Sequence, residues 1–102
     1  MNEPVKKGYW MAMVDVTDEA NYPKYIAANK AAFDKYGAKF LVRGGQGQVY
    51  EGPAASRLVV IEFDSYEQAK KWYDSQEYAG PKALRQATST GRVILVDGYD
   101  QP

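Results

Sequence analysis

The segment Phe40–Gly45 of this 102-residue chain, Phe-Leu-Val-Arg-Gly-Gly, contains the residues best suited to chemistry. Its apolar residues predict a strand that ends in Arg43, and the glycines that follow free the backbone to bend or to approach a ligand. The guanidinium group of arginine is planar and always charged, which suits carboxylates and phosphates. We therefore expect an anion or a carbonyl group to bind beside Arg43 and Gly44.

Two partners for Arg43 follow from the strand pattern. Arg43 alternates with Leu41 on one face of its strand, and a covered arginine is usually paired. Glu62, on the strand expected over residues 57–63, can form a structural ion pair with it. Alternatively, Arg43 polarises a ligand oxygen, and Glu62 moves a proton, since a partly buried carboxyl group can hold a proton near neutral pH. In this second interpretation Arg43 and Glu62 are the catalytic residues.

Asn29 stands out in the helix expected over residues 18–36. It lies seven residues after Tyr22 and four before Phe33, on an apolar stripe at helical spacing that faces the sheet. A buried amide without partners costs about 1–3 kcal/mol. Asn29 therefore either bonds a backbone carbonyl or a tyrosine hydroxyl, or contacts a ligand.

Four further residues complete the predicted ligand-binding set. Arg57 begins a strand and Arg85 lies on a short helix, so that each alone suits a solvated or salt-bridged surface role. Together with Arg43 they would build a cationic pocket. Trp72 and Tyr78 either line an aromatic pocket between helices and sheet or belong to the core.

The glycines at 44, 45 and 47 do not form a dinucleotide-binding fingerprint. They precede a strand rather than open a helix, so the helix N-terminus that would hold a pyrophosphate is missing. They indicate instead a bent or bulged strand that resumes over Gln48–Glu51.

Composition excludes several classes of function. The 13 basic residues balance the 13 acidic ones, which argues against nucleic-acid binding. Cysteine and histidine are absent, which removes disulfides, thiolate nucleophiles, the usual zinc sites and a haem-binding histidine. We therefore expect no metal and no cofactor. No apolar run approaches the ~18 residues of a membrane span and no signal-peptide pattern begins the chain, so we expect no membrane association and a cytoplasmic location.

The order of the expected elements predicts the fold. Strands and helices alternate as βαββαβ, which is typical of an α+β, ferredoxin-like domain with a four-stranded antiparallel sheet and two main helices on one face. We expect one domain over residues 1–102, with an ordered core of about 8–98. The predicted strands are Tyr9–Val16, Lys39–Arg43, Arg57–Phe63 and Arg92–Asp97; the predicted helices are Asp18–Tyr36, one begun by a Ser65–Gln68 capping box, and a short one from Gly80-Pro81 to about Gln86, followed by a loop over Thr88–Gly91.

Two of these strands are apolar on both faces, at Leu58–Ile61 and at Val93–Val96. An antiparallel sheet with one wet face should instead alternate apolar and polar residues. The second face therefore needs a cover, and a twin subunit is the simplest one. We predict a homodimer whose sheets pack face to face.

Short segments along nearly the whole chain carry a resemblance to a known family. They are Gly8-Tyr9-Trp10, Thr17-Asp18, Ala27-Ala28-Asn29, Phe40–Gly45, Glu51-Gly52, Arg57–Phe63, Trp72-Tyr73, Ser75–Tyr78 and Lys82–Arg85. With these segments the chain resembles the domain of unknown function 1330 family. This resemblance implies the superfamily of dimeric α+β barrels, which also contains cofactor-free monooxygenases, muconolactone isomerases and haem-handling enzymes. The histidines of the haem-binding relatives have no counterpart here, and Gly80-Pro81 departs from the family pattern.

Residues and resemblance together give two hypotheses of function. In the first, a dimeric α+β barrel binds a small carbonyl- or carboxylate-bearing molecule; an enzyme of this kind would be a cofactor-free isomerase or monooxygenase in which Arg43 faces a developing enolate. In the second, the protein is a non-enzymatic ligand-binding or stress-associated dimer whose Arg–Glu pairs only hold the fold.

Overall fold

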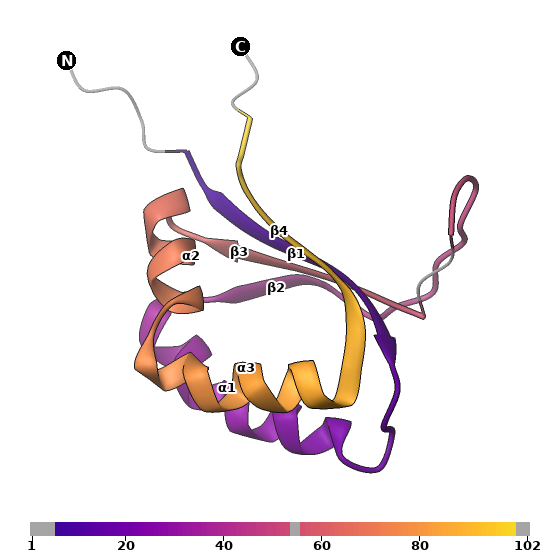
Figure 1. Cartoon of the computed structure of the whole chain (residues 1–102). Coiled ribbons are helices and arrows are strands. Elements are labelled where there is room, and N and C mark those ends of the chain that lie inside the picture. The colour runs from indigo at the N-terminus through magenta and orange to yellow at the C-terminus, as the bar shows by residue number, and fades with distance from the viewer. Residues whose placement is uncertain (1–5, 54–55, 100–102) are drawn as a thin grey trace, which may run out of the picture.

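A computed structural model of the chain describes residues 6–53 and 56–99 (Figure 1). The antiparallel sheet has the strand order β2-β3-β1-β4, and the helices of the described residues all cover one of its faces (Figure 1). This arrangement confirms the α+β, ferredoxin-like fold. The elements are β1 (Gly8–Val16), α1 (Tyr22–Tyr36), β2 (Lys39–Arg43), β3 (Arg57–Phe63), α2 (Tyr66–Tyr73), α3 (Gln76–Thr88) and β4 (Ser89–Asp97).

Trp72 on α2 is the centre of the core between sheet and helices. Its side chain is fully buried, and its ring lies against aromatic rings from two strands and two other helices. Of the two roles expected for Trp72, the structure therefore shows the core role. The distances between ring centroids are 4.1 Å to Tyr78 of α3, 5.2 Å to Phe63 of β3, 5.4 Å to Trp10 of β1 and 5.4 Å to Phe33 of α1.

The face of the sheet away from the helices is apolar and exposed in the single chain. Along β3, Val59 and Ile61 are buried against the helices, whereas Leu58 points to the other face and is 44% exposed. On β4, Ile94 and Val96 are 47% and 41% exposed. We call this surface the open face of the sheet.

A β-bulge in β2 changes the direction of Arg43. The register with β3 shifts between Phe40 and Val42, which makes Leu41 the extra residue. Arg43 therefore pairs with Val59, whose side chain is buried on the helix side of the sheet. The expectation that Arg43 shares a face with Leu41 is wrong, because an extra residue reverses the alternation of all that follow it.

The predicted continuation of β2 over Gln48–Glu51 is also wrong. The strand ends at Arg43, and the chain then leaves the sheet as a long arm before β3 begins (Figure 1). Gly44 and Gly52 turn this arm with φ angles of +64° and +84°. No strand lies beside the described part of the arm, so its backbone has no ladder to join. The bulge itself lies within β2 and not at the glycines.

α3 begins before the predicted position and passes directly into β4. The hydroxyl of Ser75 accepts from the amide of Tyr78 over 3.1 Å, which caps the helix five residues before the Gly80-Pro81 pair. Pro81 thus lies inside the helix, where it removes one backbone hydrogen bond. At the other end Ser89 donates to the carbonyl of Arg85 over 2.6 Å, so β4 starts at Ser89 without the predicted loop.

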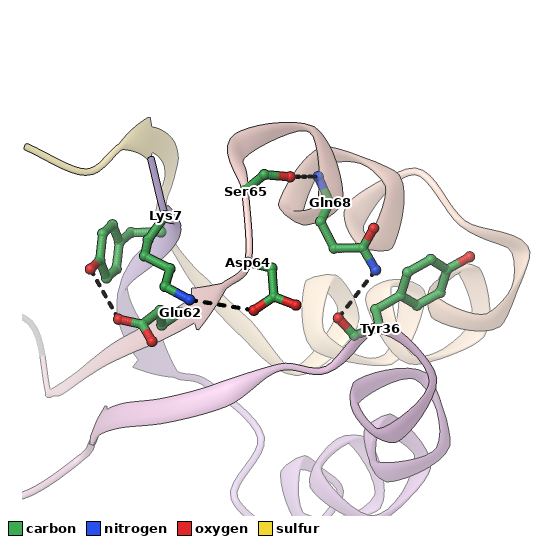
Figure 2. A network of polar contacts seen from close by, with 7 residues as sticks. Lys7, Tyr36, Glu62, Asp64, Ser65 and Gln68 are labelled. Atoms are coloured by element: carbon green, nitrogen blue, oxygen red, sulfur yellow. Dashed lines mark hydrogen bonds and ion pairs between the residues drawn. The ribbon is translucent and has the colours of Figure 1, made fainter. Parts of the chain in front are cut away.

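The predicted cap at the start of α2 is confirmed in part. The Ser65 hydroxyl accepts from the Gln68 amide over 3.0 Å, as a capping serine does (Figure 2). The Gln68 side chain does not complete a capping box. It donates instead to the carbonyl of Tyr36 over 3.3 Å and so joins α2 to the end of α1 (Figure 2).

We predict that Trp72→Ala lowers the free energy of unfolding by about 3–5 kcal/mol, because it leaves a cavity in the centre of the aromatic core. Urea denaturation followed by circular dichroism measures this loss. The matched control is Tyr99→Ala, which removes a ring that is 78% exposed and should change stability by less than about 0.5 kcal/mol. Equal effects of the two substitutions would contradict the central role of Trp72.

Candidate functional site

A small cavity lies between the helix side of the sheet and α1. Its volume is about 20 Å³, which suits one water-sized group. Two outer grooves of about 520 Å³ each adjoin the cavity. Arg43 lines both the cavity and the first groove, and Arg57 lines both the cavity and the second. The remaining lining residues of the cavity are Trp10, Val14, Tyr22, Tyr25, Ile26, Asn29, Phe33, Phe40, Val59, Ile61 and Arg85.

Three arginines converge on this cavity, and aromatic rings support each of them. A guanidinium stacked on a ring gains cation–π attraction and keeps its N–H groups free for another partner. The distances from the central guanidinium carbon to the ring centroid are 4.3 Å for Arg43 over Phe40, 5.9 Å for Arg57 over Tyr22 and 5.9 Å for Arg85 over Trp10.

These arginines have no carboxylate partner among the residues that the structure describes. The cavity lining contains no Asp or Glu, and the ion pairs within residues 6–53 and 56–99 all involve lysine side chains at the surface. Arg85 in particular is only 8% exposed. A buried cation without a counterion is costly, because it gives up its hydration. The cavity is therefore a cationic site, and no acidic side chain of the described residues neutralises its arginines.

A hydrogen-bonded chain runs from the cavity into the helix layer. Asn29, which is 2% exposed, donates from Nδ2 to the hydroxyl of Tyr25 over 3.1 Å. The hydroxyls of Tyr25 and Tyr78 lie 3.0 Å apart. Arg85 donates from Nε to the hydroxyl of Tyr78 over 3.3 Å and from Nη2 to that of Tyr73 over 3.4 Å. Of the two roles considered for Asn29, the structure shows the bond to a tyrosine hydroxyl, and it places Asn29 on the cavity wall as well.

Burial keeps Tyr25 and Tyr78 protonated. It raises the pKa of Tyr25 far above its ordinary value, and the neighbouring Tyr78 adds to the rise. Burial also raises the pKa of Tyr78, against the opposing effect of its bonds to Tyr25 and Arg85. Burial by itself lowers the pKa of Arg85, but the nearby tyrosine oxygens, that of Tyr78 foremost, outweigh it and raise the pKa overall. The site therefore offers hydrogen-bond donors and positive charge at neutral pH, and Tyr25 and Tyr78 do not act as bases.

Several polar atoms around the cavity are buried without a partner. Among the described residues, Oδ1 of Asn29 has no donor, and Nε of Arg57 and Nε1 of Trp10 have no acceptor. Buried polar atoms are nearly always satisfied in folded proteins. Among the described residues, three of the four such side-chain atoms lie on residues of the cavity wall, and the fourth, Nε1 of Trp72, lies in the aromatic core.

Gly44 lets Arg57 reach its position. A Cβ atom at residue 44 would lie 2.6 Å from Nη1 of Arg57, and the φ angle of +64° at this residue also favours glycine. The Gly44 amide donates to the carbonyl of Leu58 over 2.8 Å, which fixes the backbone at the end of β2. Gly44 thus leaves space for Arg57, and its predicted contact with a ligand stays a prediction.

The structure separates Glu62 from the other predicted site residues. Glu62 lies on the open face of the sheet, where it accepts a hydrogen bond from the hydroxyl of Tyr9 over 3.0 Å (Figure 2). The bulge has moved Arg43 to the opposite face. The expected ion pair between Arg43 and Glu62 is therefore not formed, and the two residues cannot act on one ligand within a single chain.

The other predicted residues lie in or near the cavity, apart from Trp72. Asn29, Arg43, Arg57 and Arg85 line it, and Tyr78 lies directly behind it through its bonds to Tyr25 and Arg85; their functions stay predictions. Sequence reasoning missed Tyr25 as a site residue. The signal was present, because Tyr25 precedes Asn29 by four residues and such pairs meet on a helix.

The fold and the cavity define a class of protein: an α+β, ferredoxin-like chain with an arginine-lined cavity between sheet and helices. A family model, the domain of unknown function DUF1330, matches residues 7–99. The chain therefore belongs to the DUF1330 family. A comparison with curated proteins finds no match.

Solved structures with this fold include proteins of known and of unknown function. A protein of unknown function from Rhodopseudomonas palustris has a TM-score of 0.78 and 16% identity, with 98% of this chain and 88% of that chain covered. SnoaB, a cofactor-independent oxygenase from Streptomyces nogalater, has a TM-score of 0.62 and 11% identity, with 95% and 97% covered. A possible oxidoreductase from Bacteroides thetaiotaomicron has a TM-score of 0.55 and 14% identity, with 91% and 98% covered. At these identities the similarity shows the fold alone.

We predict that Gly44→Ala lowers the free energy of unfolding by about 1–2 kcal/mol, since alanine is strained at this φ angle and its Cβ must displace Arg57. Chemical denaturation measures the effect. Gly45→Ala is the matched control, because no atom lies within 4 Å of a Cβ at this position. If the two variants unfold alike, Gly44 does not hold the proposed space for Arg57.

Proposed function

We propose that the protein binds a small molecule that carries a carboxylate or carbonyl group, in the cavity between the sheet and α1. The observation that carries this proposal is the convergence of three arginines that have no carboxylate partner in the described structure. An anion would neutralise them and accept from Nε of Arg57, a buried donor that has no partner.

The two outer grooves make room for the rest of such a molecule. Arg43 and Arg57 stand between the inner cavity and the grooves. The groove beside Arg43 is lined in part by Ile26, Phe33 and Phe40, which also line the cavity. An apolar or aromatic body would lie there, while its charged end meets the arginines. This is the usual design of a small-molecule site, with apolar walls and a few polar groups that fix orientation.

A cofactor-free oxygenase or isomerase is the second candidate function. The fold similarity to SnoaB favours it, and the arginines would stabilise an enolate in such a reaction. The reaction also needs a base, however, and the described residues of the cavity include no carboxylate or histidine. Tyr25 stays protonated, and Glu62 lies on the other face of the sheet. Binding is therefore the function that the geometry supports best, with or without catalysis, and it also fits the non-enzymatic alternative.

We further propose that a second copy of the chain covers the open face of the sheet. Leu58 on β3 and Ile94 and Val96 on β4, on either side of β1, form part of an apolar surface, and such surfaces mark interfaces in folded proteins. A two-fold axis would place this surface against itself, as most homodimers do. No helix in the described part of the chain is long and apolar enough to cross a membrane. A cytoplasmic location stays a prediction.

We predict that Arg57→Gln weakens the binding of phenylacetate at least about tenfold, and Arg43→Gln similarly, because each removes a charged donor from the site. Isothermal titration calorimetry at low salt measures the affinities. Neither arginine forms an ion pair in the described structure, so both variants should keep the unfolding free energy of the parent to within about 0.5 kcal/mol.

The matched control for these variants is Lys24→Gln, which removes one positive charge from the exposed side of α1. It should leave the affinity within about twofold of the parent, because an exposed charge is screened by salt. Equal weakening by all three substitutions would reduce the effect to net charge and overturn the site.

We predict that Leu58→Lys shifts the protein from dimer to monomer, because it places a charge in the centre of the apolar open face. Sedimentation velocity at micromolar concentration measures the change. Ala83→Lys, on the exposed side of α3, is the control and should leave the dimer intact. A parent protein that sediments as a monomer at this concentration would contradict the proposed dimer.

A further inference from the structure

The amide of Asn29 has one polar atom that the fold leaves unused. Its Nδ2 donates to Tyr25, whereas its Oδ1 is buried and lacks a partner in the described part of the chain. Arginines and indoles cannot accept a bond and tyrosine hydroxyls can give one, so the cavity wall is rich in donors. The free acceptor atom, Oδ1 of Asn29, therefore sets a second requirement. Next to its anionic group, the ligand must also carry a hydrogen-bond donor.

A count of the hydroxyl protons in the hydrogen-bonded chain also leads to the cavity wall at Asn29 and Tyr25. Arg85 donates to the oxygen of Tyr78, and Asn29 donates to the oxygen of Tyr25. The contact between the two tyrosine hydroxyls uses only one of their two protons. The other proton has no acceptor among the described residues. Tyr25 lines the cavity and Tyr78 does not. When the hydroxyl of Tyr78 donates to the oxygen of Tyr25, the hydroxyl proton of Tyr25 is left for a ligand in the cavity.

The cavity therefore presents an acceptor and a donor side by side, on two residues joined by a 3.1 Å hydrogen bond. A hydroxyl group matches this pair, because it can donate to Oδ1 of Asn29 and accept from Tyr25 at once. A methylene group in the same place would leave both unsatisfied, and a keto oxygen would satisfy only Tyr25.

We propose that the ligand of this site is a hydroxycarboxylate: its hydroxyl bonds Asn29 and Tyr25, and its carboxylate meets the arginines. This inference rests on the proposed anion-binding function and adds the substrate class to it. The apolar body of the molecule lies in the groove beside Arg43 and Phe40.

The test compares three carboxylates of matched shape on the unmodified protein. Mandelate carries a hydroxyl next to its carboxylate, benzoylformate carries a keto oxygen at the same carbon, and phenylacetate carries neither. We expect calorimetry at pH 7 to show mandelate binding about three- to tenfold more tightly than either of the others, the value of one or two hydrogen bonds. Tyr25→Phe should reduce this preference by about threefold or more, and Tyr36→Phe on the same helix should not.

Each result of this comparison decides one of the two proposals. Equal affinities for mandelate and phenylacetate would overturn the hydroxycarboxylate and leave the anion site standing. Tighter binding of benzoylformate would also overturn it, because Asn29 would then present its NH₂ group to the cavity. If none of the three acids binds at millimolar concentration, the anion-binding function fails and this inference fails with it. The comparison of the three acids uses the unmodified protein, so it tests the proposal even if the Tyr25→Phe variant does not fold.

Discussion

The packing of Trp72 is the interaction on which the arrangement of sheet and helices depends. Its ring contacts rings from β1, β3, α1 and α3, so one side chain sets the distance between the layers at that end of the molecule. Trp10 extends this contact toward the cavity, because its ring lies against Trp72 and also near the guanidinium of Arg85. The cavity thus begins where the aromatic core ends.

The position of Arg43 in the site follows from a departure from regular structure. The bulge at Leu41 gives Arg43 and Phe40, three residues apart, the same side of β2, whereas a regular strand would put them on opposite sides. Aromatic rings then support the arginines by cation–π contact, and no carboxylate in the described part of the chain pairs with them. A salt bridge would have held them as well, but it would have consumed the charge that an anionic ligand needs. The described lining of the cavity also contains no carboxylate or histidine that could act as a base. The geometry therefore favours ligand binding over proton-transfer catalysis.

Local signals in the sequence predicted the fold well. The element order, the extent of β3, the start of β2 and the cap at Ser65 could all be predicted, because alternation and capping chemistry act over a few residues. The bulge was not readable, because Leu41 and Val42 are both apolar and suit either face. Pro81 misled the prediction of α3, since the cap at Ser75 and the burial of Tyr78 outweigh one lost hydrogen bond. At the site, the error at Arg43 carried over to Glu62, whereas Asn29 and Arg85 line the cavity and their binding roles stay predictions.

The close approach of Arg57 to Gly44 couples these two positions in one direction. A side chain at residue 44 would overlap the Arg57 head group, whereas a smaller residue at position 57 would leave Gly44 without a clash. Members of the family that keep this arginine in place should therefore keep the glycine, and a side chain at residue 44 should mark members whose arginine has moved or been replaced. The pair offers a way to divide the DUF1330 family into groups by ligand before any substrate is known.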